Sequence, residues 1–234
     1  MQNKLRKGGV KNLLTLPNIA TLFNLSLGFM AIIYSTVSIE IAYLLVIFAT
    51  LTDSLDGFLA RRLGQISEIG KELDSLADII SFGIAPAVML INCKSAFDII
   101  LIIVSIIYVS CGALRLARFN VYGAKEFFEG LAIPASAMLV SSSVITLPPN
   151  ICAFLFVLAS ILMISSIEYP SLKVKEGVKA NLYSILIGFI IFIIYTNVVI
   201  LLPFSSIIVL MGSLILSQLF SYGLVSPMLF KKIK

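Results

Sequence analysis

The 234-residue chain contains no histidine, and this absence removes several kinds of chemistry at once. A histidine-ligated zinc site, a serine–histidine catalytic pair and a phosphohistidine intermediate all require the imidazole side chain. A general base in this protein therefore has to be a carboxylate or, as a weaker alternative, a lysine or a tyrosine.

Cysteine is also scarce, with Cys93, Cys111 and Cys152 as the three cysteines of the chain. They lie in or beside apolar runs, and no two of them form a CxxC pair. We interpret them as small buried apolar side chains rather than as disulfide partners or metal ligands.

Charge is the third scarcity: 12% of the residues are charged, whereas 59% are hydrophobic and the mean hydropathy is +1.08. Long apolar runs recur from end to end, and no polar stretch exceeds about 20 residues, which leaves no room for a separate soluble domain. We therefore expect one all-α domain over residues 1–234, a polytopic integral membrane helix bundle. Its basic segment 1–14 lacks a small-residue cleavage site, so we expect it to be retained as a cytoplasmic N-terminal segment.

Candidate membrane spans can be counted because a helix needs about 20 apolar residues to cross the hydrocarbon layer. The sequence offers eight candidates, separated by polar or turn-rich stretches. They cover residues 15–37, 39–62, 71–92, 96–117, 131–148, 150–167, 181–199 and 203–229. The pair on either side of Pro148 and Pro149 is short.

Basic residues test this topology. With eight spans, all of the 17 lysines and arginines except Lys94 fall on one face of the membrane. The positive-inside rule makes that face cytoplasmic, so both termini are expected there and the protein is expected in the cytoplasmic membrane. The net charge of +5 then reflects topology and contact with anionic headgroups rather than nucleic-acid binding.

The stretch 51–80 concentrates the acidic residues that the chain otherwise has in small number. On helices, two sets of positions each share one face: Asp53, Asp56, Gly57, Ala60 and Arg61 in the first, and Gly70, Asp74 and Asp78 in the second. A short cytoplasmic turn joins them, so we expect antiparallel neighbouring helices whose four carboxylates converge near the cytoplasmic surface.

Four convergent carboxylates suit one or two hard divalent cations, Mg2+ or Mn2+, better than a soft metal. Such a cation can hold a diphosphate and offset the charge that develops in phosphoryl transfer. Two alternatives stay open on geometry alone. The acids can pair with Arg61, Arg62 and Lys71 in a structural network, or they can form the cation or proton pathway of a transporter. In the structural alternative, Gly57 and Gly70 are tight helix contacts.

Read as one pattern, D-x2-D-G-x2-A-R-x8-G-x3-D-x3-D from Asp53 to Asp78 resembles the complete signature of the CDP-alcohol phosphatidyltransferases. Every position of the signature is filled at the family's spacing. The resemblance implies an integral membrane enzyme that moves a phosphatidyl group from a CDP-linked lipid to an alcohol and releases CMP.

The resemblance also implies roles for individual residues. Asp53, Asp56 and Asp74 resemble ligands of the metal on the diphosphate, and Asp78 resembles the residue that completes the metal site and removes the proton from the acceptor hydroxyl. Gly57 leaves room for the nucleotide. Contacts with the CDP-lipid are expected from Asn24, Gly57, Ala60, Arg61, Ser67, Gly70 and Lys71. For Asn24 the alternative is a helix–helix hydrogen bond, and for Lys71 it is membrane anchoring.

Three further stretches, 15–29, 114–120 and 128–137, resemble the phosphatidylserine synthase branch of this family. The branch implies L-serine as the acceptor, CDP-diacylglycerol or a CDP-linked ether lipid as the donor, and a homodimer. Ala132 departs from the pattern, because the branch often has proline there, and this weakens the assignment of the branch but not of the family.

The acceptor must be held by its charged groups while its hydroxyl faces the phosphorus. We expect Arg118, ahead of Arg115, to bind the serine carboxylate, with Asn120 nearby; the alternative is that the arginines are membrane anchors. A sibling enzyme that uses glycerol phosphate or inositol phosphate would need the same basic residues for a second phosphate. A cation- or proton-coupled transporter is the more distant alternative, because the acids occur once and not in an internal repeat.

Overall fold

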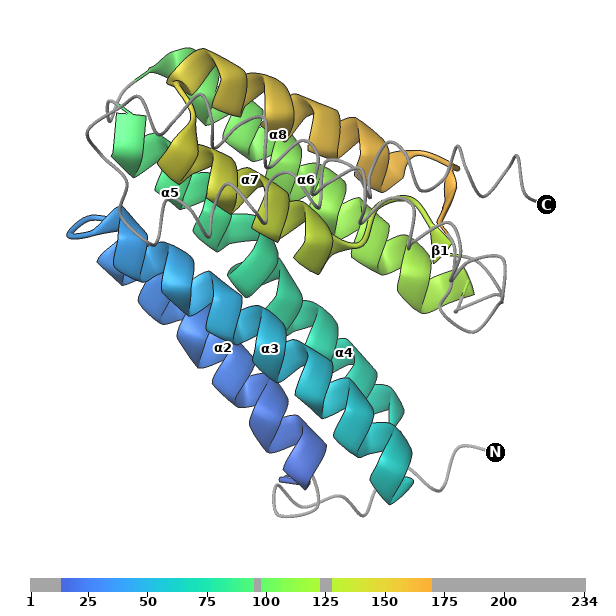
Figure 1. Ribbon diagram of the computed structural model, residues 1–234. Helices are drawn as coiled ribbons and strands as arrows, with labels where there is room; N and C mark the ends of the chain where they lie inside the picture. Colours follow the sequence, from blue (N-terminus) through green and yellow to red (C-terminus); the bar gives the residue numbers. More distant parts are fainter. Residues whose placement is uncertain (1–13, 95–97, 123–127, 170–234) are drawn as a thin grey trace, which may run out of the picture.

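The computed structural model describes residues 14–94, 98–122 and 128–169 of the chain, and helices dominate these ranges (Figure 1). Two helices, α2 (Leu16–Tyr34) and α3 (Ile39–Leu63), form an antiparallel hairpin. A third segment is continuous from α4 (Glu68–Asp78) through the π-helix η1 (Ile79–Ile84) into α5 (Ala85–Lys94). The helices α6 (Ile99–Tyr122), α7 (Ile133–Thr146) and α8 (Pro149–Ile164) follow.

The described helices agree with the first six predicted spans, although not all of them are equally long. Four segments are long and apolar enough to cross a membrane: α2, α3, the segment Glu68–Asn92 and α6. The helices α7 and α8 have 14 and 16 residues, as the short predictions around Pro148 suggested. The predicted spans 181–199 and 203–229 lie outside the described residues, so the count of eight and the orientation of the termini stay predictions.

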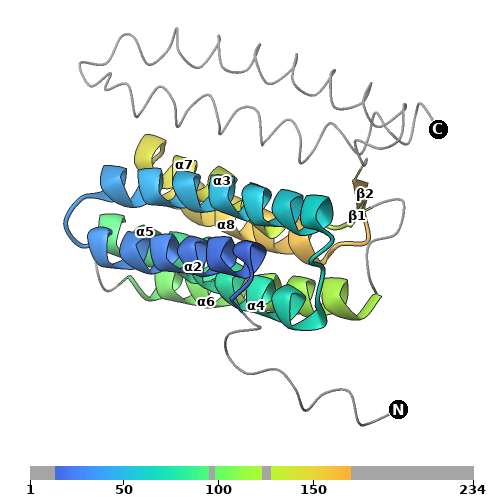
Figure 2. The same ribbon diagram turned by 90° about the horizontal axis from the view of Figure 1, so that it is seen from below.

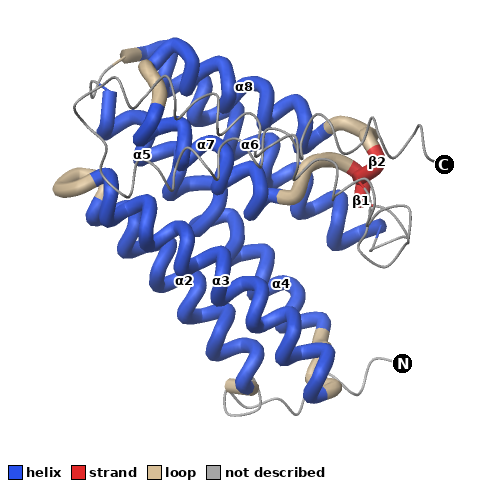
Figure 3. Tube along the Cα trace, viewed as in Figure 1, coloured by secondary structure: helices blue, strands red, loops and turns tan. Residues whose placement is uncertain are grey.

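One small element was not predicted. The strands β1 (Phe128–Glu129) and β2 (Glu168–Tyr169) pair antiparallel beside the ends of α6 and α8, as the tube in Figure 3 shows. Gly130 follows β1 with a φ of 75°, a backbone conformation that favours glycine. The ladder therefore joins the segment that precedes α7 to the segment that follows α8.

Caps determine where the acidic helices end. Gly64 ends α3 in the left-handed conformation, with a φ of 63° and its N–H directed to the Ala60 carbonyl. Three residues later the Ser67 hydroxyl accepts a hydrogen bond from the Gly70 N–H at 3.0 Å and begins α4. The short turn between these caps brings the C-terminal end of α3 and the N-terminal end of α4 to the same end of the bundle, where α6 also ends (Figure 2).

The helix α2 packs on both acidic helices. It contacts α3 along its length and also touches α4 and η1, whereas α3 and α4 approach each other much less closely. The polar residues Asn18, Thr21 and Asn24 lie on its buried face, which explains their presence in an apolar span. The two acidic helices are thus antiparallel, as predicted, but α2 rather than direct packing holds them in place.

The hydrophobic core lies between these helices. Tyr108 of α6 and Phe156 of α8 are fully buried and meet edge to face, with their ring centroids 5.0 Å apart. Cys152 is buried, as predicted, and its Sγ donates to the Ser143 carbonyl at 3.1 Å. Cys111 is only half-buried, and the side chain of Cys93 lies outside the described residues. Large apolar side chains on the outside, such as Phe23, Phe29 and Ile106, suit contact with lipid.

Candidate active site

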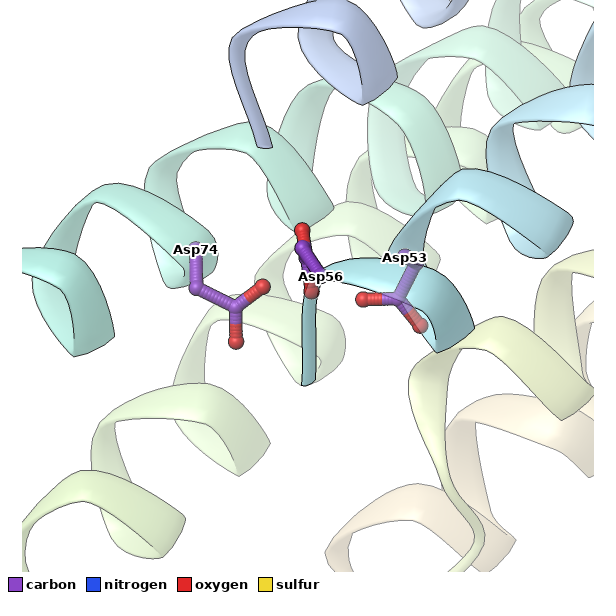
Figure 4. Close-up of side chains that lie close together, drawn as sticks. All are labelled: Asp53, Asp56 and Asp74. Carbon is purple, nitrogen blue, oxygen red and sulfur yellow. The ribbon is translucent and has the colours of Figure 1, made fainter. Parts of the chain in front are cut away.

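Three carboxylates meet between α3 and α4. The side chains of Asp53 and Asp56 project from α3 and that of Asp74 from α4, and each offers an oxygen that lies within 4.8 Å of the others (Figure 4). Asp53 and Asp56 share a helix face because they are three residues apart, and the short turn at Gly64 aims α4 back at them. The predicted convergence of these three acids is therefore present in the structure.

This group is buried without a full set of partners. Asp56 is 5% exposed, and its Oδ2, like Oδ1 of Asp74, has no hydrogen-bond partner among the described residues. Like charges in a buried site are costly unless a positive charge joins them. Oxygens of this type at this spacing fit a hard divalent cation such as Mg2+ or Mn2+.

Asp78 lies beside the three carboxylates. It is 6% exposed, interacts electrostatically with Asp53, Asp74 and Asp56, and accepts a hydrogen bond at Oδ1 from Nδ2 of Asn24 at 3.4 Å. The group that lies within 4.8 Å does not include it. Asp78 as a further metal ligand and as the catalytic base stays a prediction.

Arg115 is a buried positive charge beside the acids. This α6 side chain is 8% exposed and interacts with Asp78 and Asp53, and its Nε has no hydrogen-bond partner in the described part of the chain. Its guanidinium also stacks over the ring of Phe119, with 5.4 Å from Cζ to the ring centroid. A buried guanidinium with an unused donor beside a group of acids is suited to bind an anion.

Arg118 has a different environment from the one that the sequence suggested. Its Nη1 donates to the Ile164 carbonyl at 3.1 Å, and its Nη2 donates to the carbonyls of Glu129, Met163 and Ser165 at 2.9, 3.1 and 3.2 Å. Three of these carbonyls belong to the C-terminal end of α8, where no helical N–H is available to them. The Arg118 guanidinium is occupied by this cap, whereas Arg115 keeps an unused donor, and the binding of the serine carboxylate by either arginine stays a prediction.

Lys71 and Asn120 join α4 to α6. The Lys71 Nζ donates to the Asn120 carbonyl at 2.9 Å, and Asn120 Nδ2 donates to the Ser75 hydroxyl at 2.9 Å. Asn120 Oδ1 is buried and has no partner among the described residues. The lysine thus serves a helix–helix contact in this structure, while the free amide oxygen of Asn120 remains available to a ligand.

The two signature glycines differ in their surroundings. Among the described residues, a Cβ added at Gly57 would meet only the Arg61 guanidinium, at 3.4 Å from Nη1, so in this part of the chain only a flexible side chain lies against that side of α3. A Cβ at Gly70 would lie 2.9 Å from Asn18 Oδ1 and 3.0 Å from the Ser67 hydroxyl. Gly57 therefore leaves room for a ligand, whereas Gly70 permits the close contact of α4 with α2.

The remaining predicted CDP-lipid contacts spread along the same end of the bundle. Arg61 and Ser67 are exposed, Ala60 is half-buried, and Asn24 is fully buried against Asp78. The Ser67 hydroxyl already caps α4, so a nucleotide contact would be an additional role for it. Asn24 thus lies beside the acids, whereas Arg61 and Ser67 lie on the exposed surface near the ends of α3 and α4.

Two residues that the sequence did not single out connect the segment just after Asp78 to neighbouring helices. The Ser81 hydroxyl donates to the Asn24 carbonyl at 3.0 Å, and the Tyr108 hydroxyl donates to the Phe82 carbonyl at 3.0 Å. The available signal was Pro86, a proline inside an apolar span, which a helix cannot accommodate without a local change.

With this geometry established, comparison with known proteins identifies the family. The sequence profile of the CDP-alcohol phosphatidyltransferases matches residues 14–217, a range that includes all four aspartates. The chain belongs to the CDP-alcohol phosphatidyltransferase family. The family assignment made from the signature is thus confirmed.

Relatives of this CDP-alcohol phosphatidyltransferase carry consistent names. The archaetidylserine synthase of Methanothermobacter thermautotrophicus is 42% identical over 167 residues, which cover 69% of this chain and 72% of that protein. The CDP-diacylglycerol–serine O-phosphatidyltransferase of Methanocaldococcus jannaschii is 42% identical over 163 residues, 69% of this chain and 76% of the other. The enzyme of the same name from Helicobacter pylori is 36% identical over 212 residues, 84% and 86% of the two chains.

Family membership and the apolar helices together establish the broad class. The chain is an integral membrane phosphotransferase of the CDP-alcohol type, with four described segments long enough to cross a membrane. Family membership therefore accounts for the four aspartates without a purely structural charge network and without a transporter pathway.

Proposed function

We propose that the chain is a phosphatidylserine synthase. It transfers a phosphatidyl group from CDP-diacylglycerol, or from the corresponding CDP-linked ether lipid, to the hydroxyl of L-serine and releases CMP. The observation that carries the proposal is the group of Asp53, Asp56 and Asp74, with the buried side chains of Asp78 and Arg115 beside it, in a chain of this family. The names of the relatives at 36–42% identity support serine as the acceptor.

One or two Mg2+ or Mn2+ ions are the proposed cofactor, held by Asp53, Asp56 and Asp74 and completed by Asp78. When bound, a divalent cation grips the diphosphate of the donor and offsets the charge that develops as CMP leaves. The two orphan carboxylate oxygens, Oδ2 of Asp56 and Oδ1 of Asp74, support this assignment.

The side chains around the metal site act on the acceptor. Asp78 removes the proton of the serine hydroxyl, and the amide of Asn24 orients its carboxylate through the hydrogen bond to Oδ1. The serine oxygen then forms a bond to the phosphorus of the phosphatidyl group, and the bond from that phosphorus to the CMP oxygen breaks. Arg115 binds the serine carboxylate, and the free Oδ1 of Asn120 is suited to accept from the serine ammonium.

The CDP-lipid donor is proposed to bind on the α3 side of the site, near one face of the membrane. We propose that the cytidine diphosphate lies over Gly57, in contact with Asn24, Ala60, Arg61 and Ser67, with Gly70 and Lys71 shaping the α4 wall. The described basic residues at this end of the bundle, including Arg61, Arg62 and Arg118, support a site near the cytoplasmic face of the cytoplasmic membrane. A homodimer is proposed from the branch resemblance, and nucleic acid is not a proposed partner.

Purified protein should convert the substrates directly. With Mn2+ or Mg2+, CDP-diacylglycerol and labelled L-serine, we expect a serine phospholipid and an equal amount of CMP, separated by thin-layer chromatography. Parallel reactions offer glycerol phosphate or inositol phosphate in place of serine. Turnover with one of these and none with serine would assign the chain to the sibling branch and contradict the proposal.

The two arginines of α6 should separate binding from stability. We expect Arg115→Ala to raise the KM for serine about 10- to 100-fold, the value of one charge-assisted hydrogen-bonded contact, while the KM for the CDP-lipid changes little. Arg118→Ala should leave the serine KM near the wild-type value and lower the Tm by several degrees, because four carbonyls lose their donor. Steady-state kinetics and thermal unfolding in detergent measure both effects. A large rise of the serine KM in Arg118→Ala, with no rise in Arg115→Ala, would assign the serine carboxylate to Arg118 instead of Arg115.

A further inference from the structure

The backbone changes its winding immediately after Asp78. The segment η1 from Ile79 to Ile84 is a π-helix, and the Ala85 N–H donates to the carbonyl of Ile80, five residues earlier. Such wide turns are rare and break the regular spacing of side chains along a helix. Here the break separates the two signature aspartates of α4, Asp74 and Asp78, from the apolar helix α5.

Pro86 explains why the turn is wide. A proline inside a helix has no N–H to donate and presses its ring against the carbonyl four residues earlier, which is that of Phe82. This carbonyl is therefore without its α-helical donor, and the Tyr108 hydroxyl of α6 donates to it at 3.0 Å. The Ser136 hydroxyl of α7 in turn donates to the Tyr108 oxygen at 3.2 Å. Tyr108 and Ser136 are both fully buried.

The opposite side of the wide turn is held by α2. The Ser81 hydroxyl donates to the Asn24 carbonyl at 3.0 Å, and the amide of the same asparagine donates to Asp78 Oδ1 at 3.4 Å. This contact needs a close approach of the two helices, since a Cβ at Gly28 would lie 2.5 Å from the Ser81 Cα. Asp78, Asn24 and the wide turn are thus connected by consecutive buried hydrogen bonds.

We propose that Tyr108 and Ser81 are positioning residues that hold the wide turn and thereby the Asp78 carboxylate in its reactive orientation. This inference rests on the proposed function, in which Asp78 takes the proton of the acceptor hydroxyl. Tyr108 fixes the turn from the side of α6 and α7, and Ser81 fixes it from the side of α2. Neither residue contacts a substrate, so both act on the rate of the chemical step rather than on the affinity for substrate.

A pair of tyrosines provides the first test, because each variant removes one buried hydroxyl. Tyr108→Phe deletes the donor to Phe82, whereas Tyr43→Phe deletes a fully buried hydroxyl that has no hydrogen-bond partner in the described part of the chain. Since a displacement of about 1 Å in a reacting group costs up to about 100-fold in rate, we expect Tyr108→Phe to lower kcat about 10-fold or more. Both KM values should stay within about two-fold of wild type, and Tyr43→Phe should match wild type in kcat.

A pair of serines provides the second test. Ser81→Ala removes the bond from the wide turn to α2, and the control Ser142→Ala removes a buried hydroxyl that donates only within its own helix, to the Leu139 carbonyl at 2.9 Å. We expect a fall of kcat for Ser81→Ala alone. The double variant Tyr108→Phe with Ser81→Ala should fall by less than the product of the two single effects, because both act on one turn.

A failure of this inference can be distinguished from a failure of the proposed function. All variants are assayed with the acceptor that the wild-type enzyme uses best, so a failure of serine as substrate sinks the proposed function and leaves the comparison of variants intact. A kcat of Tyr108→Phe equal to that of Tyr43→Phe would overturn the inference. So would a rise in either KM as large as the fall in kcat, which would place the effect on binding.

Discussion

Asp78→Asn should lower kcat at least about 1,000-fold, because an amide cannot take the proton of the acceptor hydroxyl and a general base contributes about 100- to 10,000-fold. The asparagine has nearly the same shape and retains an oxygen that can accept from Asn24 Nδ2. The protein should therefore fold and bind the CDP-lipid as the wild type does. CMP release measures the turnover, and isothermal titration with the CDP-lipid measures the binding.

Asp98→Asn is the matched control for this substitution. Asp98 is exposed just before α6, where its Oδ1 accepts from the Ile100 N–H at 2.9 Å, a bond that asparagine can also make. We expect this variant to keep full activity. Retained turnover in Asp78→Asn would remove Asp78 as the base, and a loss of CDP-lipid binding would assign it to the metal site alone.

Removal of divalent cations should abolish the transfer, and Mn2+ or Mg2+ should restore it. A readout independent of activity is available, since a cation that binds only the folded protein raises the Tm. We expect Mn2+ to raise the Tm of the wild type by a few degrees and to have no effect on Asp56→Asn, which lacks a carboxylate of the buried group. Asp98→Asn should respond as the wild type does.

Two results would contradict the metal assignment. One is full activity in excess chelator after dialysis. The other is an equal Mn2+-dependent rise of Tm in the wild type and in Asp56→Asn, which would place the cation elsewhere in the protein.

The sequence predicted the parts of the site that depend on local spacing. Asp53 and Asp56 share a face because they are three residues apart, and the short turn between Gly64 and Ser67 directs Asp74 toward them. The first six helices were predictable for the same reason, since apolar length and capping residues are local properties. The last two predicted spans lie outside the described residues.

The parts that the sequence could not predict depend on residues distant in the chain. Arg115 and Arg118 are one helical turn apart, and no local pattern says which of them faces the acids. The difference comes mainly from the end of α8, about 45 residues further on, where three carbonyls accept hydrogen bonds from Arg118, and a fourth acceptor is the Glu129 carbonyl of β1. The wide turn after Asp78 was equally hidden, because Pro86 indicates a disturbed helix but not the donor from α6 that stabilises it.

The surroundings of Gly57 and Gly70 also depend on residues distant in the chain. Both occur in the signature and both allowed the same two interpretations, as space for a ligand or as a helix contact. The structure separates them, since within the described ranges Gly57 faces only a flexible arginine and Gly70 faces α2. Only the position of a neighbouring helix distinguishes the two, and spacing within one helix does not contain it.

The approach of α2 to η1 has a consequence for how natural variation at Gly28 is interpreted. Even alanine would overlap the backbone at Ser81 there, so selection for a folded protein alone is enough to keep glycine at this position. A residue unchanged for that reason would be easily mistaken for one that touches the substrate. Glycine would be kept there because α2 and η1 lie too close together for a larger side chain.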